Sequence, residues 1–406
     1  MKKLLIVMMI VALSGVSAFA MSFDTEKGKI DAYASVRGYA VYNNNVSDDK
    51  TDERNYSVLA IGVQPNSTFG LKWTQDDSFA HVEVGGDMSL RLLYGEYKFA
   101  GGDMGKLRFG QFASMTNTHG YYGRKLNNED GLQGFGTLKQ VRRPGVGYEI
   151  SGFAISAFAL DPNEKTAVTN LYNIDARYDY AQYIEVMPRI ELTYTMPNMF
   201  RVGLSYVQTD VMVDQVPSAN VTKPKNDQHY NIAAYHVMAA AYPKINDDMQ
   251  IIASAFYAVN GGLYGMAQRA NGYAYPAGMN AASAATSGFG YASLMPVLDS
   301  KDTEAKGKVK DTNTLGGALA FKFQTLEVGL GYQSSSNDTW GYDVNGMGAY
   351  ANYGVKLGSN FTLTPEISYM DSGDKPGAKP APGAAKAKAV KNSTVMQVGA
   401  HFRMDI

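Results

Sequence analysis

Ionisable side chains recur at every second position in several short stretches, and this spacing has chemical consequences. Arg189 and Glu191 alternate with apolar residues in 189–196, and His401, Arg403 and Asp405 do so in 396–406. Side chains along a β-strand point to opposite faces in turn, so both stretches predict strands with one charged and one apolar face. A face with this much charge must contact water, where it can attract ions and orient polar solutes.

The charged face of the predicted strands contains more cations than anions, which hints at a preference for anions. Its cations are Arg37, Lys72, Arg108, Lys139, Arg143, Arg189, Arg201, Lys322, Lys356 and Arg403, and its anions are Asp31, Glu83, Glu149, Glu191, Glu327, Glu366 and Asp405. Two interpretations stay open for Arg143, Arg189 and Arg201. They form either a cationic patch on one wall or part of a set of scattered ion pairs that only keeps the face solvated.

The segment 113–136 is the second candidate site. It contains Arg124, Lys125, Glu129 and Asp130 among several glycines. A loop of this length has a function of its own or is disordered. If it folds inward, its carboxylates face the arginines across a narrow gap, and the field between them orients dipolar solutes. We therefore predict a constriction with Glu129 and Asp130 on the segment and with the pore-lining residues Arg108, Arg124, Arg143, Arg189 and Arg201.

Catalytic and metal-binding patterns are weak. The histidines lack the HExxH spacing of zinc enzymes, and there is no cysteine for a thiolate site. The stretch 100–106, A-G-G-D-M-G-K, is near a phosphate-binding loop, but Ala100 replaces its first glycine and Leu107 stands where Ser or Thr is required. A formal net charge of −1 gives no reason to expect nucleic acid. We predict no enzyme activity, cofactor or metal, with a barrel hydrolase as the disfavoured alternative.

The elements that would hold these residues are short strands. Alternation is clearest in 325–332, 361–369 and 396–406, whereas 56–64 and 171–187 are each either strand or loop. A soluble sandwich gives the same alternation, but here very short polar turns alternate with long loops, as they do in membrane barrels. The predicted fold is an all-β transmembrane antiparallel β-barrel of about 16 strands with an inward-folded third loop. The long loops 260–311 and 372–392 are predicted to be extracellular.

The first residues have the pattern of a secretory signal. Lys2 and Lys3 precede an apolar run from Leu4, and Ala18-Phe19-Ala20 supplies a small-residue cleavage site. We therefore expect 1–20 to be a cleaved signal peptide and 21–406 to form a barrel in the bacterial outer membrane. The 42 glycines and 28 tyrosines fit this expectation, because tyrosine suits the ends of a membrane wall and glycine suits crowded strands.

Residues 67–111 resemble the porins of Gram-negative outer membranes. The stretch 67–72 (S-T-F-G-L-K) is similar to the family's S-R-x-G-F-K strand, 91–99 (R-L-L-Y-G-E-Y-K-F) to its R-x-x-Y-G strand, and 105–111 (G-K-L-R-F-G-Q) to its G-x-x-R-x-G-Q strand. The Tyr-Gly-Glu wording and Arg142-Arg143-Pro144 are most similar to the trimeric porins associated with dicarboxylate uptake. Two features depart from the family: Ile406 stands where Phe or Trp is usual, and 113–136 lacks the P-E-F-G-type element of general porins.

The resemblance implies a homotrimer that lets small hydrophilic solutes diffuse through a channel, with 113–136 in the position of the family's inward-folded third loop. Outer-membrane lipid, lipopolysaccharide and small solutes are then the expected partners. The competing hypothesis is a surface antigen or adhesin whose barrel only displays loops. In that case 260–311 and 372–392 would be the binding parts.

Overall fold

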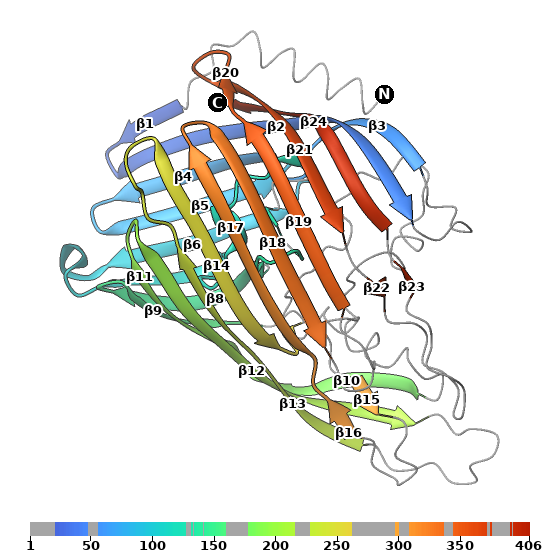
Figure 1. Cartoon of the computed structure of the whole chain (residues 1–406). Coiled ribbons are helices and arrows are strands. Elements are labelled where there is room, and N and C mark those ends of the chain that lie inside the picture. Colours follow the sequence, from blue (N-terminus) through green and yellow to red (C-terminus); the bar gives the residue numbers. More distant parts are fainter. Residues whose placement is uncertain are drawn as a thin grey trace, which may run out of the picture.

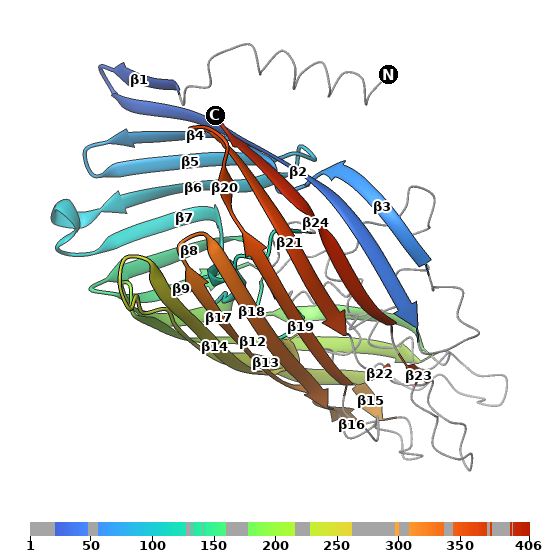
Figure 2. The ribbon, with the colours of Figure 1, turned by 45° about the horizontal axis from the view of Figure 1, so that its top comes forward.

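A computed structural model describes residues 21–47, 56–126, 131–132, 134–140, 142–159, 178–215, 228–261, 297–299, 308–336, 344–371, 374–375, 390–391 and 393–406. These residues form an antiparallel barrel that consists almost entirely of strands (Figures 1 and 2). The predicted barrel is therefore confirmed. The predicted signal peptide, 1–20, and most of the loops 260–311 and 372–392 lie outside the described residues.

Among the described residues the wall has sixteen strands besides the hairpin strand β1, because β3 and β4, β10 and β11, and β19 and β20 are consecutive parts of single wall strands. The first elements are β1 (Met21–Thr25), β2 (Gly28–Ser47), β3 (Tyr56–Val63), β4 (Thr68–Gln75), β5 (Ser78–Gly85), β6 (Leu90–Lys98), η1 (Phe99–Gly102), β7 (Lys106–Phe112), η2 (His119–Tyr121), β8 (Arg143–Ile150), β9 (Phe153–Phe158), β10 (Tyr178–Val186) and β11 (Arg189–Met196). The remaining wall strands are β12 (Phe200–Gln215), β13 (Gln228–Ala241), β14 (Met249–Val259), β17 (Asn313–Phe323), β18 (Leu326–Ser336), β19 (Val344–Tyr353), β20 (Val355–Lys356), β21 (Phe361–Asp371) and β24 (Ser393–Asp405). Two small hairpins stand apart from the wall: β15 (Val297–Asp299) with β16 (Lys308–Lys310), and β22 (Asp374–Lys375) with β23 (Val390–Lys391).

The barrel closes where β2 meets β24. On one edge of β2, Ser35–Ser47 pairs with Ser393–Asp405. On the other edge, β2 pairs with β3 and β4 in turn. The hairpin strand β1 lies on the same edge as β24, next to the N-terminal end of β2. The stretch 56–64, which the sequence left open, is therefore a strand up to Val63.

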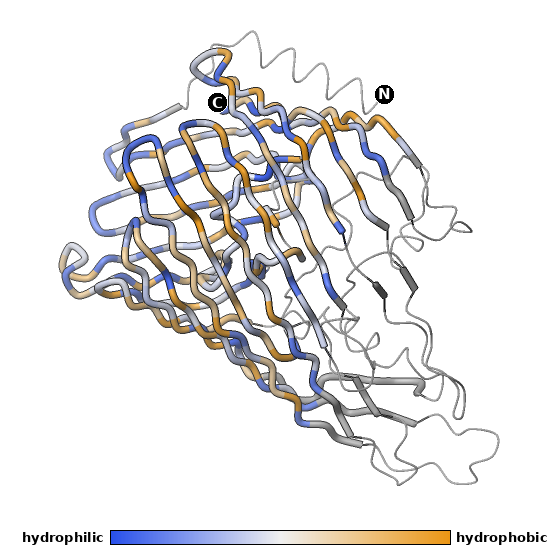
Figure 3. Tube along the Cα trace, viewed as in Figure 1, coloured by the Kyte–Doolittle hydropathy of each residue, from blue (hydrophilic) through white to orange (hydrophobic). Residues whose placement is uncertain are grey.

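Side chains alternate between two surfaces along the wall. In β18, Glu327 and Gln333 are buried on the inner face, whereas Val328, Leu330 and Tyr332 are 46, 57 and 49% exposed on the outer face. Figure 3 shows the same alternation of hydrophilic and hydrophobic residues along the neighbouring strands. Among the described residues, no helix has the length and apolar character needed to cross a membrane.

One sector of the wall is lower than the rest. The strands β4 to β9 have six to nine residues each, whereas β2 and β12 have 20 and 16. Their long-loop ends stop early: β5 ends at Gly85, and β6 begins at Leu90 after a tight turn. The strand β3 rises beyond this point with β2 as its neighbour.

Candidate functional site

The chain enters the lumen after β7 and leaves it before β8. We call its described part, residues 113–126, 131–132 and 134–140, the inward segment. Its contacts lie on the inner faces of β11, β12, β13, β14, β17, β18, β19, β21 and β24, and we call these faces together the seating wall. The segment therefore crosses the lumen from β7 to the far side.

A carboxylate of the seating wall holds the start of the segment. Glu191 on β11 accepts hydrogen bonds from the Ser114 hydroxyl at 2.7 Å and from the Met115 backbone N–H at 2.9 Å. Arg201 on β12 donates to the Met115 carbonyl at 3.3 Å and to the Thr195 hydroxyl at 2.9 Å. Backbone groups that would otherwise be unpaired inside the barrel are thereby satisfied.

Two further carboxylates hold the tip. Glu327 on β18 accepts the Gly123 N–H at 2.6 Å, and Glu366 on β21 accepts the N–H groups of Lys125 and Leu126 at 2.5 and 3.3 Å. Charge-assisted bonds of this kind are stronger than bonds between neutral groups. On the other flank, the Gln64 side chain donates to the Lys125 carbonyl at 2.8 Å.

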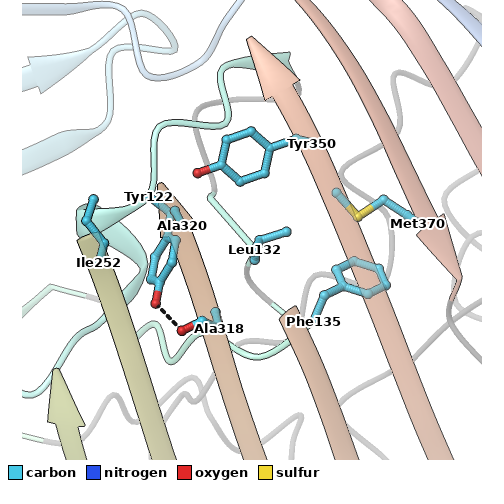
Figure 4. Packing of buried hydrophobic residues seen from close by; sticks show 8 residues of the cluster. All are labelled: Tyr122, Leu132, Phe135, Ile252, Ala318, Ala320, Tyr350 and Met370. Atoms are coloured by element: carbon cyan, nitrogen blue, oxygen red, sulfur yellow. Dashed lines mark hydrogen bonds between the residues drawn. The ribbon is translucent and has the colours of Figure 1, made fainter. Parts of the chain in front are cut away.

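An apolar cluster anchors the middle of the segment (Figure 4). Its members are Tyr122, Leu132 and Phe135 from the segment and Ile252, Ala318, Ala320, Tyr350 and Met370 from the wall. The Tyr122 hydroxyl also donates to the Ala318 carbonyl at 2.7 Å. Glycines leave room for this contact: a Cβ at Gly331 would overlap the Phe135 carbonyl oxygen, and one at Gly348 would come within 3.0 Å of the Phe135 Cβ.

One histidine of the segment is partly buried, with its Nδ1 out of contact with water. His119 lies in η2, and burial, reinforced by the cations Lys139 and Arg142, lowers its pKa to about 3. The imidazole is therefore neutral at physiological pH. Burial also raises the pKa of Tyr121 and of Tyr122 to about 12, so this part of the segment carries no titrating charge near neutrality.

The opposite side of the lumen is arranged differently. The hydrogen bonds of the inward segment described above go to the seating wall and to Gln64. We call the inner faces of β4 to β7 and of the N-terminal part of β2 the open wall. Its charged side chains keep contact with water: Arg91, Glu83 and Arg108 are 18, 13 and 21% exposed, and Lys72 is exposed.

Aromatic rings and cations cover the open wall. Lys72 lies 4.9 Å from the centre of the Tyr33 ring, and the Arg108 guanidinium lies 5.3 Å from that of Tyr94. His81 joins the two tyrosines, with its Nε2 2.6 Å from the Tyr33 hydroxyl and its ring 5.5 Å from the Tyr94 ring. Cation–π attraction helps to hold both cations in place.

Two arginines and one carboxylate lie near one another at the upper end of the open wall. Arg91 donates to Glu83 at 2.9 Å, and the Tyr33 hydroxyl donates to the other oxygen of Glu83 at 2.7 Å. Arg142 lies near both Arg91 and Glu83, and burial and the Arg91 charge lower its pKa. Arginine remains protonated despite such shifts, so this cluster has a surplus of positive charge.

Three of the predicted arginines lie on the inner face of the wall. Arg108 on β7 pairs with Glu96, Arg143 begins β8, and Arg201 lies on β12 beside the segment. Arg108 belongs to the open wall, while Arg201 touches the segment.

Two predicted pore-lining residues are buried. Arg124 is 5% exposed and donates to Gln397 at 2.9 Å, and Arg189 is fully buried, 3.1 Å from Glu191 and stacked on Phe158. Their prediction as pore-lining residues is wrong, because alternation identifies the inner face but not what covers it. Glu129 and Asp130 lie outside the described residues.

Sequence reasoning missed Tyr33, His81, Arg91, Tyr94 and Arg142 as lumen residues. Arg91, Tyr94 and Arg142 stand within the stretches that carry the family resemblance, so that signal was available. No sequence signal pointed to Tyr33 or His81, because an aromatic residue in a strand does not show by its type whether it faces the lumen.

Comparison with known proteins agrees with this architecture. No family model matches the chain, and no curated protein matches its sequence. The outer membrane channel DcaP of Acinetobacter baumannii has a TM-score of 0.55 and 15% identity, covering 95% of this chain and 99% of that one. An anion-selective porin from Comamonas acidovorans has a TM-score of 0.50 and 12% identity, covering 93% of this chain and 100% of that one. OmpT of Vibrio cholerae has a TM-score of 0.50 and 15% identity, covering 94% of this chain and 100% of that one.

The chain has the fold of these outer-membrane β-barrels. At such identities the likeness concerns the barrel itself. What the protein does has to be inferred from the residues inside the barrel, on the seating wall and the open wall.

Proposed function

We propose that the chain is a porin of the bacterial outer membrane, a water-filled channel for passive diffusion of small hydrophilic solutes and ions. The division of the lumen carries this proposal. The inward segment is fixed to one side, and charged side chains on the other side remain in water. An apolar outer face suits lipid, and a charged inner face suits a wet channel. Diffusion needs no catalytic group and no cofactor.

The charge balance of the open wall favours anions. Lys29, Lys72, Arg91, Lys106 and Arg108 on this wall and the adjacent Arg142 stand against Asp31, Glu83 and Glu96. The carboxylates of the seating wall add little negative potential to the passage, because Glu191, Glu327 and Glu366 already accept hydrogen bonds from the segment. Focused positive potential raises the local concentration of anionic solutes.

The passage runs between the inward segment and the open wall, and the segment sets its width. In this proposal Glu129 and Asp130 of the same loop oppose Arg108 across the gap, and their charge moderates the anion preference. Outer-membrane lipid and lipopolysaccharide surround the barrel, and three copies form the functional unit, as the family resemblance implies.

A planar-bilayer recording tests the proposal. Purified protein is expected to give stepwise conductance, and a salt gradient is expected to give a reversal potential of the sign for anion preference. Replacing Glu129 and Asp130 together by Ala should increase that preference. If correctly folded protein gives no conductance in the bilayer, the channel proposal is contradicted. The alternative is then favoured, a surface antigen that binds partners through 260–311 and 372–392.

A further inference from the structure

Three aromatic rings meet on the inner face of the open wall, and we call them the ring cluster. Phe79 and His81 come from β5 and Tyr94 from β6, two strands that lie side by side in the wall (Figure 2). The ring centres are 6.1 Å apart for Phe79 and His81 and 6.0 Å apart for Phe79 and Tyr94. Those of His81 and Tyr94 are 5.5 Å apart. Each ring therefore touches the other two.

Phe79 is unusual on this face because its side chain is a hydrocarbon. Alternation along β5 puts it on the same face as His81, and its neighbours across the strand pairs are Thr74 and Glu96. Phe79 is partly exposed, whereas Phe112 on the inner face of β7 is only 2% exposed. Contact with water is unfavourable for an apolar ring. Departures of this kind from the local pattern are expected at functional sites.

An accessible cation lies beside the ring cluster. Lys72 on β4 faces His81 on β5, and its ammonium lies 4.9 Å from the centre of the Tyr33 ring. Asp31 on β2 faces Lys72 from the other side, but its carboxylate forms an ion pair with Lys29 at 3.1 Å. Lys72 is exposed, so a solute in the lumen can reach its ammonium.

A second cation lies on the other flank of the ring cluster. The Arg108 guanidinium is 5.3 Å from the centre of the Tyr94 ring, and Arg108 is paired with Glu96. Because that carboxylate offsets part of its charge, Arg108 attracts an anion less strongly than Lys72 does. The ring cluster thus lies between two cations, and the more accessible of them is Lys72.

A solute that combines a flat ring with one carboxylate matches this arrangement. Its carboxylate can accept a charge-assisted hydrogen bond from the Lys72 ammonium. Its ring can pack against Phe79 and Tyr94 in an offset or edge-to-face geometry, which removes apolar surface of both partners from water. An aliphatic acid makes only the ionic contact, and a neutral aromatic molecule makes only the ring contact.

We propose that the ring cluster and Lys72 form a binding subsite for aromatic monocarboxylates on their way through the channel. The inference rests on the proposed function, and it names a class of solute that the charge balance of the open wall does not select. Ring contacts favour the aromatic acid over an aliphatic acid of the same charge by about two- to ten-fold in affinity.

Saturation-transfer NMR titrations of the purified protein in detergent test this subsite. The two probes are benzoate and cyclohexanecarboxylate, which have the same charge and nearly the same size. The variant Phe79→Leu removes the ring and keeps an apolar side chain, and the matched control Phe69→Leu makes the same change on the outer face of β4, where Phe69 is 53% exposed. A shift in gel mobility on heating verifies that each variant is folded, and Phe79→Met replaces Phe79→Leu if the latter does not fold.

Benzoate is expected to bind the natural chain and Phe69→Leu about two- to ten-fold more tightly than cyclohexanecarboxylate. Phe79→Leu is expected to bind both acids equally, and Lys72→Gln should bind both more weakly while the preference for benzoate remains. The proposal is overturned if the natural chain binds both acids equally, if the preference survives in Phe79→Leu, or if Lys72→Gln binds both acids as tightly as the natural chain does.

Binding measured in detergent is independent of conductance. If folded protein prefers benzoate but gives no conductance in a bilayer, only the proposed channel is contradicted. If it conducts but binds both acids equally, only this subsite is contradicted.

Discussion

Carboxylates face the lumen on both the seating wall and the open wall, but their partners differ. Glu327 and Glu366 accept backbone N–H groups of the inward segment and are 6 and 3% exposed. Glu83 and Glu96 pair with arginines of neighbouring strands and remain in contact with water. The same residue type thus fixes a loop on one side and tunes the potential of the passage on the other. The difference shows that the inner face of a barrel is not one functional surface.

The largest loss in the free energy of unfolding is expected on removing Glu366, which binds the tip of the inward segment. Glu366→Ala removes the carboxylate that lies 3.9 Å from Arg124 Nε and leaves two buried N–H groups without their acceptor. Loss of one partner of a buried pair costs about 3–5 kcal/mol. Urea unfolding of the refolded protein measures this loss, and single-channel conductance should rise as the tip leaves the wall. The control Glu149→Ala breaks a pair with Lys106 that is 29–36% exposed, worth about 0–1 kcal/mol. Equal losses of unfolding free energy in the two variants would contradict the proposed difference between the seating wall and the rest of the lumen.

A smaller loss in the free energy of unfolding is expected on replacing Gly331, against which the inward segment packs. Gly331→Ala forces a methyl group against the Phe135 carbonyl and the Leu132 side chain, and overpacking of this kind costs about 1–3 kcal/mol. The same unfolding assay should show no comparable loss for Gly358→Ala, since a Cβ there meets nothing within 4 Å. A neutral Gly331→Ala would mean that the segment is loosely seated.

On the open wall, substitutions should change selectivity and leave stability nearly intact. The double variant Arg91→Gln and Arg142→Gln removes two positive charges beside Glu83. A several-fold fall in the anion-to-cation permeability ratio is expected from the reversal potential in a salt gradient, because surface charge acts through the local ion concentration. Lys356→Gln, at the exposed short-turn end of the seating wall, should move the ratio less. The open wall does not set selectivity if both variants move it equally.

The last prediction concerns acid stability. His119 has a folded pKa of about 3, below its ordinary value of 6.5, so the unfolded chain binds more protons between these pH values. Its contribution to the free energy of unfolding therefore falls as pH decreases from about 6.5 towards 3. His119→Gln should lose less stability between pH 7 and pH 4 than the natural chain in urea unfolding. An identical pH dependence would show that His119 is not buried in solution.

Sequence alone predicted the barrel and its alternation because both depend on local period and turn length. The strand starting at Arg189 and the strand around Val328 lie where the pattern predicted them. The sequence did not predict which inner residues would be buried. Arg124 and Arg189 are buried by contacts with residues distant in sequence, Gln397 and Phe158. One local feature of the sequence accompanies the low sector of the wall: Pro65 stands between β3 and β4, where the strand is interrupted. Proline has no N–H to donate to a neighbouring strand.

The shared edge of β2 also bears on the order of assembly. Ala34 exchanges two backbone hydrogen bonds with Ile406, with N···O distances of 2.8 and 2.7 Å, while Ala32 already faces Met21 of β1. The hairpin of β1 and β2 joins sequence neighbours and can form early, whereas the seam with β24 joins distant segments and must form late. A slip of one residue in that seam would turn the apolar face of β24 inward. By occupying the next stretch of the edge, β1 acts as a stop that fixes the register at which the last strand docks.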